Sequence, residues 1–154
     1  MRVFKFGGAS VKDAEGIKNV YDVLQKVGYE DVLLVVSAMG KTTNALELVI
    51  KNYFEKSAEL NSSVQEVKKY HNQILLDLFE DDKNAVFGAV NSQFSDLEYF
   101  LAHNKSPNYN FVYDQIVSYG ELISTTVLSH YMNYMGINTQ WLDVRNFVKT
   151  NANY

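Results

Sequence analysis

Residues 31–36, Asp-Val-Leu-Leu-Val-Val, form an unbroken run of β-branched and aliphatic side chains. A run of this kind without polar alternation is typical of a strand that is buried on both faces, as in a parallel sheet. Residues 2–6 form another β-prone segment, which ends at Gly7 and Gly8. Between the two strands, apolar residues recur at three- and four-residue steps over 11–27, which predicts a helix. We therefore predict a βαβ unit in a central parallel sheet.

The middle of the chain, at about residues 44–104, has helical periodicity almost throughout. Three apolar stripes predict three helices here, separated by polar turns near residues 59–62 and 80–84. Ser63 followed by Glu66 has the pattern of a capping box at the start of the second helix. No linker composition separates this helical block from the rest, so we expect an insertion packed against the sheet.

A longer helix is expected from about residue 111 to residue 135, and residues 137–142 are expected to form a third strand of the sheet. The predicted fold class is therefore α/β, with a parallel sheet and a helical insertion.

Composition excludes several classes of function. The formal net charge is −4, which leaves no overall positive charge for binding nucleic acid or anionic membranes. The chain has no cysteine, so disulfides, thiolate catalysis and cysteine-ligated metal sites are excluded, and a cytoplasmic location fits. The three histidines show no metal-ligand spacing, and we expect His71 and His130 at helix boundaries between core and solvent. No apolar run approaches the ~20 residues that span a bilayer, and the N-terminus has no secretory signal pattern.

The first candidate site is the turn from the first strand into the following helix. Gly7 and Gly8 allow the backbone to approach a ligand closely, and the first amides of a helix suit a phosphate. Lys5 would neutralise charge on phosphoryl oxygens, and Ser10 adds a hydroxyl. The segment is not a Walker A motif, since no Gly-Lys-Ser/Thr follows. The alternative is an ordinary Gly-Gly turn with an exposed lysine.

The second candidate site follows the second strand, over residues 37–44. Ligands of open α/β sheets bind outside the carboxyl ends of the strands, so this loop should lie beside the first one. The hydroxyls of Ser37 and Thr43 could hold an anion there. The alternative is that Thr43 or Asn44 is merely a helix N-cap.

The third candidate site is in the long helix. Gly120 inside a helix costs about 1 kcal/mol relative to alanine, which suggests a packing or ligand-approach role. Glu121 lies beside it, and Arg145 follows the last expected strand, where it could face the same cleft. The alternatives are a solvated helical glutamate and an ordinary surface arginine.

Four segments in this order and at these separations resemble the aspartokinase family: Lys5–Val11, Val35–Met39 with Thr43 and Asn44, Gly120–Ser124, and Asp143–Arg145 with Thr150 and Asn151. The resemblance extends over residues 1–154. The helical block is similar to that of the subgroup with the lysine-sensitive enzymes and the bifunctional aspartokinase–homoserine dehydrogenases. The resemblance implies the amino-acid kinase fold, a three-layer α/β/α sandwich.

The resemblance also implies a reaction, the transfer of the ATP γ-phosphoryl group to the side-chain carboxylate of L-aspartate. The product, 4-phospho-L-aspartate, leads to lysine, threonine and methionine, and Mg²⁺ accompanies ATP. Lys5 would be the catalytic residue, and Ser37 and Thr43 would hydrogen-bond substrate or phosphate oxygens. Glu121 would pair with the aspartate ammonium and Arg145 with one of its carboxylates.

Two departures from the family pattern shape the expectation. Ala9 stands where the family usually has threonine, so one hydroxyl is missing from the glycine turn. Beyond Asn151 the nucleotide-binding half and the regulatory ACT domains have no counterpart. We therefore expect residues 1–154 to be the N-terminal, aspartate-binding part of a catalytic domain, inactive alone and homo-oligomeric at full length.

Two alternatives remain open. The chain could belong to another amino-acid kinase, one that acts on acetylglutamate or glutamate. It could also be a noncatalytic regulatory or interaction module that kept part of the fold.

Overall fold

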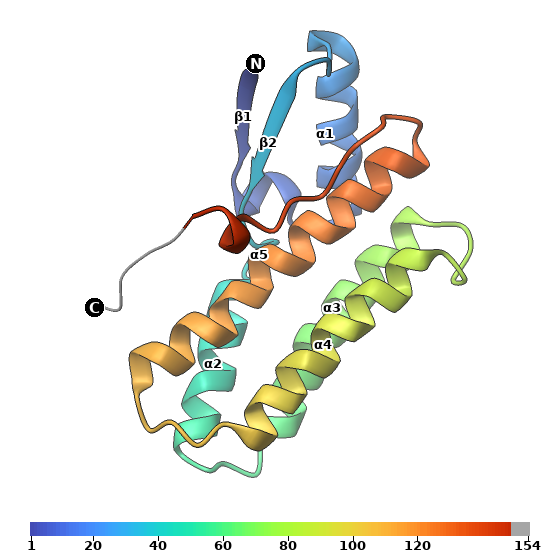
Figure 1. Cartoon of the computed structure of the whole chain (residues 1–154). Helices are drawn as coiled ribbons and strands as arrows, with labels where there is room; N and C mark the ends of the chain where they lie inside the picture. The colour runs from blue at the N-terminus through green and yellow to red at the C-terminus, as the bar shows by residue number, and fades with distance from the viewer. Residues whose placement is uncertain (149–154) are drawn as a thin grey trace.

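A computed structural model describes residues 1–148 (Figure 1). Two strands and helix α1 form one end of the molecule, helices α2–α4 form the other, and α5 runs along both. The elements in chain order are β1 (Arg2–Phe6), the 3-10 helix η1 (Gly8–Val11), α1 (Ala14–Val27), β2 (Val32–Val36), α2 (Thr42–Phe54), α3 (Leu60–Leu78), α4 (Ala85–His103), α5 (Tyr109–Tyr134) and the 3-10 helix η2 (Val144–Asn146).

The predicted βαβ unit is confirmed. β1 and β2 are parallel neighbours, with Lys5 opposite Val35 in the register. Helix α1 joins them and buries the apolar positions that the sequence periodicity marks, such as Ile17 and Leu24. It ends at Gly28, whose φ of +83° is the left-handed conformation that glycine adopts without strain.

The third strand that we predicted over residues 137–142 is not present within residues 1–148. The segment runs back from the end of α5 toward the carboxyl ends of β1 and β2 (Figure 1). It makes no backbone ladder with β2, because a cavity lies between the two. Ile137 is buried, but Trp141 and Leu142 are exposed. The apolar content of this segment predicted a strand, but a strand also needs a neighbouring backbone to pair with.

Strand β2 has one edge paired with β1 and one free edge, and the hydrogen bonds between the strands show which residues lie on each. The amide of Arg2 donates to Asp31 O, and the amide of Ser37 donates to Phe6 O. In a parallel pair, alternate residues bond to the same neighbour, so the odd-numbered residues of β2 face β1. The backbone groups of Val32, Leu34 and Val36 therefore point away from β1 and form the free edge.

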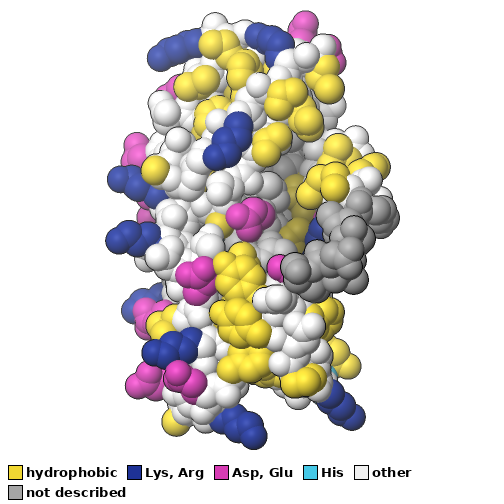
Figure 2. Space-filling model, turned by 90° about the vertical axis from the view of Figure 1, so that its left-hand side faces the viewer, with side chains coloured by type: hydrophobic (Ala, Val, Ile, Leu, Met, Phe, Trp, Pro, Cys, Tyr) yellow, Lys and Arg dark blue, Asp and Glu magenta, His cyan; other side chains and the backbone are white. Residues whose placement is uncertain are grey.

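One face of this small sheet is open. Phe4, Phe6 and Leu34 pack against the core, whereas Val3 on β1 and Val35 on β2 are 56% and 45% exposed on the opposite face. Figure 2 shows hydrophobic side chains gathered across the upper part of the corresponding side of the molecule. Buried parallel sheets carry helices on both faces. The described residues thus form a partial α/β fold, as predicted.

The helical block is built as the three apolar stripes predict, and its helices share one core with α1 and α5. The predicted turn near residues 80–84 joins α3 to α4. The capping box predicted at Ser63 is wrong, because α3 begins at Leu60 and the Ser63 hydroxyl donates to the Leu60 carbonyl inside the helix. Within residues 1–148, no helix is both long and apolar enough to cross a bilayer.

Candidate functional site

The loops that follow β1 and β2 meet at the carboxyl ends of the two strands. The amide of Gly40 donates to the Gly8 carbonyl at 3.0 Å, which joins the loops directly. A Cβ on Gly8 would lie 2.6 Å from the Ala38 carbonyl oxygen, so only glycine permits this approach. Gly40 has a φ of +53°, which also favours glycine. The glycines therefore serve close packing between two backbones, in addition to any ligand.

Lys5 and Ser10 lie beside this junction. Lys5 is exposed near the end of β1, and its Nζ is 3.6 Å from where a Cβ on Gly7 would lie. Its ammonium group therefore stands over the glycine turn, as the phosphate-site hypothesis requires. Ser10 is exposed in η1, and its amide donates to the Gly7 carbonyl at 2.9 Å.

The predicted helix start at this turn needs a correction. The glycine turn leads into the 3-10 helix η1, and the α-helix begins only at Ala14. The Asp13 carboxylate caps α1 by accepting a hydrogen bond from the Gly16 amide at 2.8 Å. The Asp13 carboxylate therefore already interacts with the positive end of the α1 dipole.

The second loop places Ser37 and Thr43 near the first. Ser37 is half-buried, and its carbonyl accepts a hydrogen bond from Ser124 Oγ on α5 at 2.8 Å. Thr43 lies in the first turn of α2, whose N-cap position is Lys41 without a side-chain bond, so neither Thr43 nor Asn44 is the cap.

Thr42, at the start of α2, is buried, and no sequence motif pointed to it. Its Oγ1 donates to the Met39 carbonyl at 2.6 Å and lies 3.4 Å from Nε2 of His71. His71 is completely buried on α3. The expectation that it lies at a boundary with solvent is wrong, because the His71 ring packs between α2 and the Phe94 ring. Burial lowers its pKa, so the imidazole is neutral at pH 7.

Gly120 and Glu121 bring α5 against the second loop. A Cβ on Gly120 would lie 2.8 Å from the Cβ of Ala38, so this buried glycine has a packing role. Glu121 is the next residue of the helix and also reaches the loop, where its Oε1 accepts a hydrogen bond from the Ala38 amide at 3.3 Å. Glu121 is half-buried, which excludes a fully solvated helical glutamate.

Arg145 lies in η2 and forms an ion pair with Asp143 two residues earlier. Its Nη2 is 2.6 Å from Asp143 Oδ2, and its Nε is 2.9 Å from Oδ1. This forked hydrogen bonding lowers the pKa of Asp143. The sequence placed Arg145 opposite a substrate carboxylate, whereas in the structure a carboxylate of the chain itself accepts these bonds. The partner motif residues Thr150 and Asn151 lie outside the described residues.

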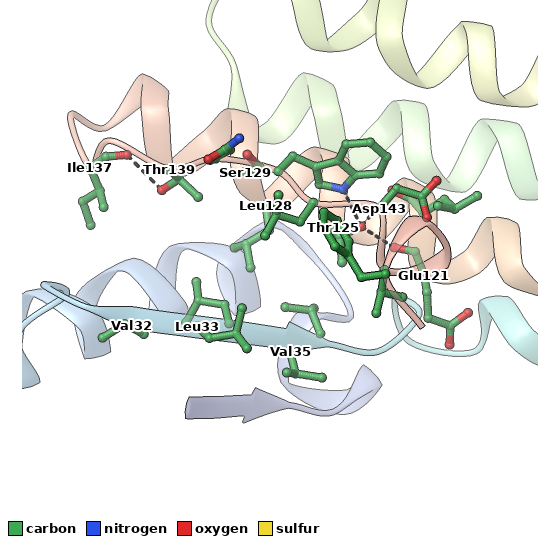
Figure 3. Close-up of a pocket in the computed structure, with 18 of the residues that line it drawn as sticks. Val32, Leu33, Val35, Glu121, Thr125, Leu128, Ser129, Ile137, Thr139 and Asp143 are labelled. Atoms are coloured by element: carbon green, nitrogen blue, oxygen red, sulfur yellow. Dashed lines mark hydrogen bonds between the residues drawn. The ribbon is translucent and has the colours of Figure 1, made fainter. Parts of the chain in front are cut away.

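A cavity of about 800 Å³ lies between β2, α5 and the segment after α5 (Figure 3). Leu33 and Val35 of β2 form one wall, Glu121 and Thr125 come from α5, and Asp143 comes from the opposite side. Glu121 and Arg145 both line this cavity, whereas Lys5, Gly7, Gly8, Ser10, Ser37 and Thr43 do not. The candidate residues therefore form two adjoining groups, one on the two loops and one along the cavity.

The acidic and histidine side chains within residues 1–148 form no group of three that could hold a metal ion.

Comparison with known proteins identifies relatives of this arrangement. The model of the amino acid kinase family matches residues 1–154. Bifunctional aspartokinase/homoserine dehydrogenase 2 of Escherichia coli (strain K12) is 28% identical over 96% of this chain and 18% of its own length.

Two solved structures of E. coli aspartokinase III are similar. The complex with lysine and aspartate is 26% identical, with a TM-score of 0.82, over 99% of this chain. The complex with aspartate and ADP is 24% identical, with a TM-score of 0.81, over all of this chain, and supports the fold. The chain spans 33% of either structure.

Proposed function

This chain belongs to the amino acid kinase family, and on that basis we propose that it is the aspartate-binding part of an aspartokinase. The complete enzyme would transfer the ATP γ-phosphoryl group to the side-chain carboxylate of L-aspartate. The solved structure of E. coli aspartokinase III, which is 26% identical over 99% of this chain, is that of its complex with lysine and aspartate. That likeness supports aspartate over the alternatives acetylglutamate and glutamate.

The observation that carries the proposal is the meeting of three distant segments at one end of the sheet. Gly8 and Gly40 join the two loops, and the Glu121 carboxylate reaches the second loop at the Ala38 amide. Loop amides and the Lys5 ammonium would bind phosphoryl oxygens, while the Glu121 carboxylate at the second loop would bind the ammonium of the amino acid. The arrangement thus offers a partner for the phosphoryl group and another for the ammonium of the amino acid.

The roles follow from these positions. Lys5 would stabilise the charge that develops on the transferring phosphoryl group, with Gly7, Gly8 and Ser10 beneath it. Ser37 and Thr43 would hydrogen-bond substrate or phosphate oxygens. Glu121 would orient the substrate through its ammonium.

Arg145 would bind a substrate carboxylate by sharing or exchanging its present bonds to Asp143. The Mg²⁺ would arrive as part of the ATP substrate complex.

The substrate assignment is tested on the chain itself by following its amide resonances during titration with L-aspartate, and with succinate as the control that lacks an ammonium. We expect shifts at Ala38 and Glu121 with L-aspartate and weaker ones with succinate. The Glu121→Gln variant should bind L-aspartate at least about tenfold more weakly, since a hydrogen bond to a charged group contributes about 1.5–3 kcal/mol. The matched variant Glu47→Gln, which alters a carboxylate on α2 that accepts a hydrogen bond from Tyr113 on α5, should bind normally.

Two results would decide against this substrate, and a third would decide against the role of Glu121. A stronger response to N-acetylglutamate would favour the other amino-acid kinases, and no specific response to any of these ligands would favour a noncatalytic module. Equal binding by Glu121→Gln and the unaltered chain would remove Glu121 from the site.

The catalytic role of Lys5 can be tested only in a longer enzyme. The chain spans only 18% of the length of the E. coli bifunctional relative. We propose that the nucleotide-binding half belongs to the additional polypeptide of an enzyme of that length. The isolated chain should therefore show no turnover with L-aspartate, ATP and Mg²⁺. In a longer enzyme Lys5→Met should lower kcat with little change in KM for aspartate, and the exposed Lys26→Met should change neither. A homo-oligomer and a cytoplasmic location belong to the same proposal.

A further inference from the structure

Tyr70 on α3 touches both loops of the candidate site from outside. Its hydroxyl donates a hydrogen bond to the Lys12 carbonyl, at the joint between η1 and α1. A Cβ on Gly40 would lie 2.7 Å from the same Tyr70 oxygen, and 3.4 Å from the Cβ of Lys12. One hydroxyl group therefore contacts the end of the first loop and the glycine of the second.

The position of this hydroxyl is set by the helical block. The Tyr70 ring packs edge-on against the ring of its neighbour His71 at 5.1 Å, and His71 is completely buried. His71 Nδ1 donates to the Val67 carbonyl, which fixes the imidazole, and its Nε2 faces Thr42 at the start of α2. Tyr70 has few rotatable bonds, so an anchored ring holds its oxygen in one place.

A backbone hydrogen bond also joins the two loops. The Gly40 amide bonds to the Gly8 carbonyl, and beyond it the second loop enters α2 while the first enters α1. Without the Tyr70 hydroxyl, the joint at Lys12 could move relative to Gly40, because surface loops with few contacts open at low free-energy cost. Burial and the nearby Asp13 raise the pKa of Tyr70, so the hydroxyl remains a donor throughout the neutral pH range.

We propose that Tyr70 is a positioning residue, through which the helical insertion holds the two loops at the spacing that ligand binding requires. This inference rests on the proposed function, and it makes the insertion a part of the site. Within residues 1–148, Tyr70 makes no hydrogen bond to Lys5 or Glu121, and its hydroxyl bonds to the Lys12 carbonyl instead.

The test compares Tyr70→Phe with Tyr53→Phe. Tyr53 is also half-buried, and its hydroxyl also donates to a backbone carbonyl, that of Asn104 at the far end of the block. Amide hydrogen exchange is measured by NMR at Gly40, with the buried Ile123 amide as the reference for global unfolding. In Tyr70→Phe we expect exchange at Gly40 to become about fivefold faster relative to Ile123, which corresponds to the loss of one hydrogen bond. In Tyr53→Phe this ratio should not change.

A role that is merely structural would speed exchange at both amides together and leave their ratio unchanged, and that result would overturn the proposal. The second readout is the affinity for L-aspartate, which should fall about fivefold in Tyr70→Phe and stay constant in Tyr53→Phe. Faster exchange at Gly40 with unchanged affinity would also overturn it. If the unaltered chain does not respond to L-aspartate, the proposed function fails, and the Gly40 ratio alone then decides whether Tyr70 positions the loops.

Discussion

Replacing Gly120 by alanine adds a methyl group where α5 packs against the second loop. The new Cβ would lie 2.8 Å from the Cβ of Ala38, well inside the 3.5–4.0 Å of an ordinary carbon contact. Ala38 is buried and its Cβ cannot rotate away, so the backbone of the loop must shift. Overpacking of this kind costs about 1–3 kcal/mol, and the helix gains about 1 kcal/mol when alanine replaces glycine. We expect a net loss of stability of up to about 2 kcal/mol.

Gly88→Ala is the matched control. Gly88 is an exposed glycine near the start of α4, and a Cβ there would meet nothing within 4 Å. Only the gain in helix propensity remains, so this variant should be more stable than the unaltered chain by about 0.5–1 kcal/mol. Both free energies of unfolding are measured by urea titration with far-UV circular dichroism. The two substitutions are chemically identical, and their difference isolates the contact with Ala38.

A rescue variant checks that the contact is the cause. In Gly120→Ala combined with Ala38→Gly the overlapping methyl group is removed, so the two changes should be less costly together than the sum of their separate effects. The reasoning would be refuted if Gly120→Ala were as stable as Gly88→Ala, or if the two changes were simply additive. Gly120→Ala should also weaken L-aspartate binding, because a shift of Ala38 alters its bond to Glu121.

Three further outcomes are expected. Gly8→Ala should destabilise the chain by about 1–3 kcal/mol in the same urea assay, because its Cβ would lie 2.6 Å from the Ala38 carbonyl oxygen; unchanged stability would contradict the close approach of the loops. The free energy of unfolding should fall as the pH drops below about 6.5, and His71 should contribute up to about 1.4 kcal/mol per pH unit, because burial lowers the pKa of His71 and only the unfolded chain then takes up the proton. The His71→Phe variant should show a flatter slope, with the remainder from His130, whose pKa burial also lowers, and an unaltered slope would contradict this assignment. Amide exchange along β2 should alternate, with Leu33 and Val35 protected by β1 and Leu34 fast at the free edge; uniform protection would show that this edge is paired in solution.

The elements of the fold were largely predictable because their signals are local. A β-prone segment gives β1, a continuous apolar run gives β2, and period-3.6 patterns give α1 and the long helices, all without knowledge of their neighbours. The start of α3 was not predictable, since Leu60 has no side-chain cap before it and Ser63, which looks like a cap, instead bonds back to Leu60 within the helix. The third strand failed for another reason, because a strand exists only where a second backbone accepts its hydrogen bonds.

The candidate site was predictable in the position of its parts and not in their partners. The rule that ligands bind at the carboxyl ends of parallel strands correctly placed the two loops together. No local pattern shows that Thr42 is the buried threonine instead of Thr43, because that depends on how α2 packs against its neighbours. The Asp13 cap and the pair of Asp143 with Arg145 are local contacts, three and two residues apart, and the residue types alone would have allowed them to be predicted.

The free edge of β2 and the candidate site are parts of one continuous feature. The backbone groups of Val32, Leu34 and Val36 point away from β1, and the next amide in this alternation is that of Ala38. Glu121 accepts the hydrogen bond of that amide. The carboxylate therefore ends the edge at the point where the strand becomes the loop. A further strand paired along β2 would satisfy the amides before Ala38. The Ala38 amide would keep its bond to Glu121, because a hydrogen bond to a charged acceptor is stronger than one to a carbonyl. The loop beyond Ala38 would therefore stay open to a ligand.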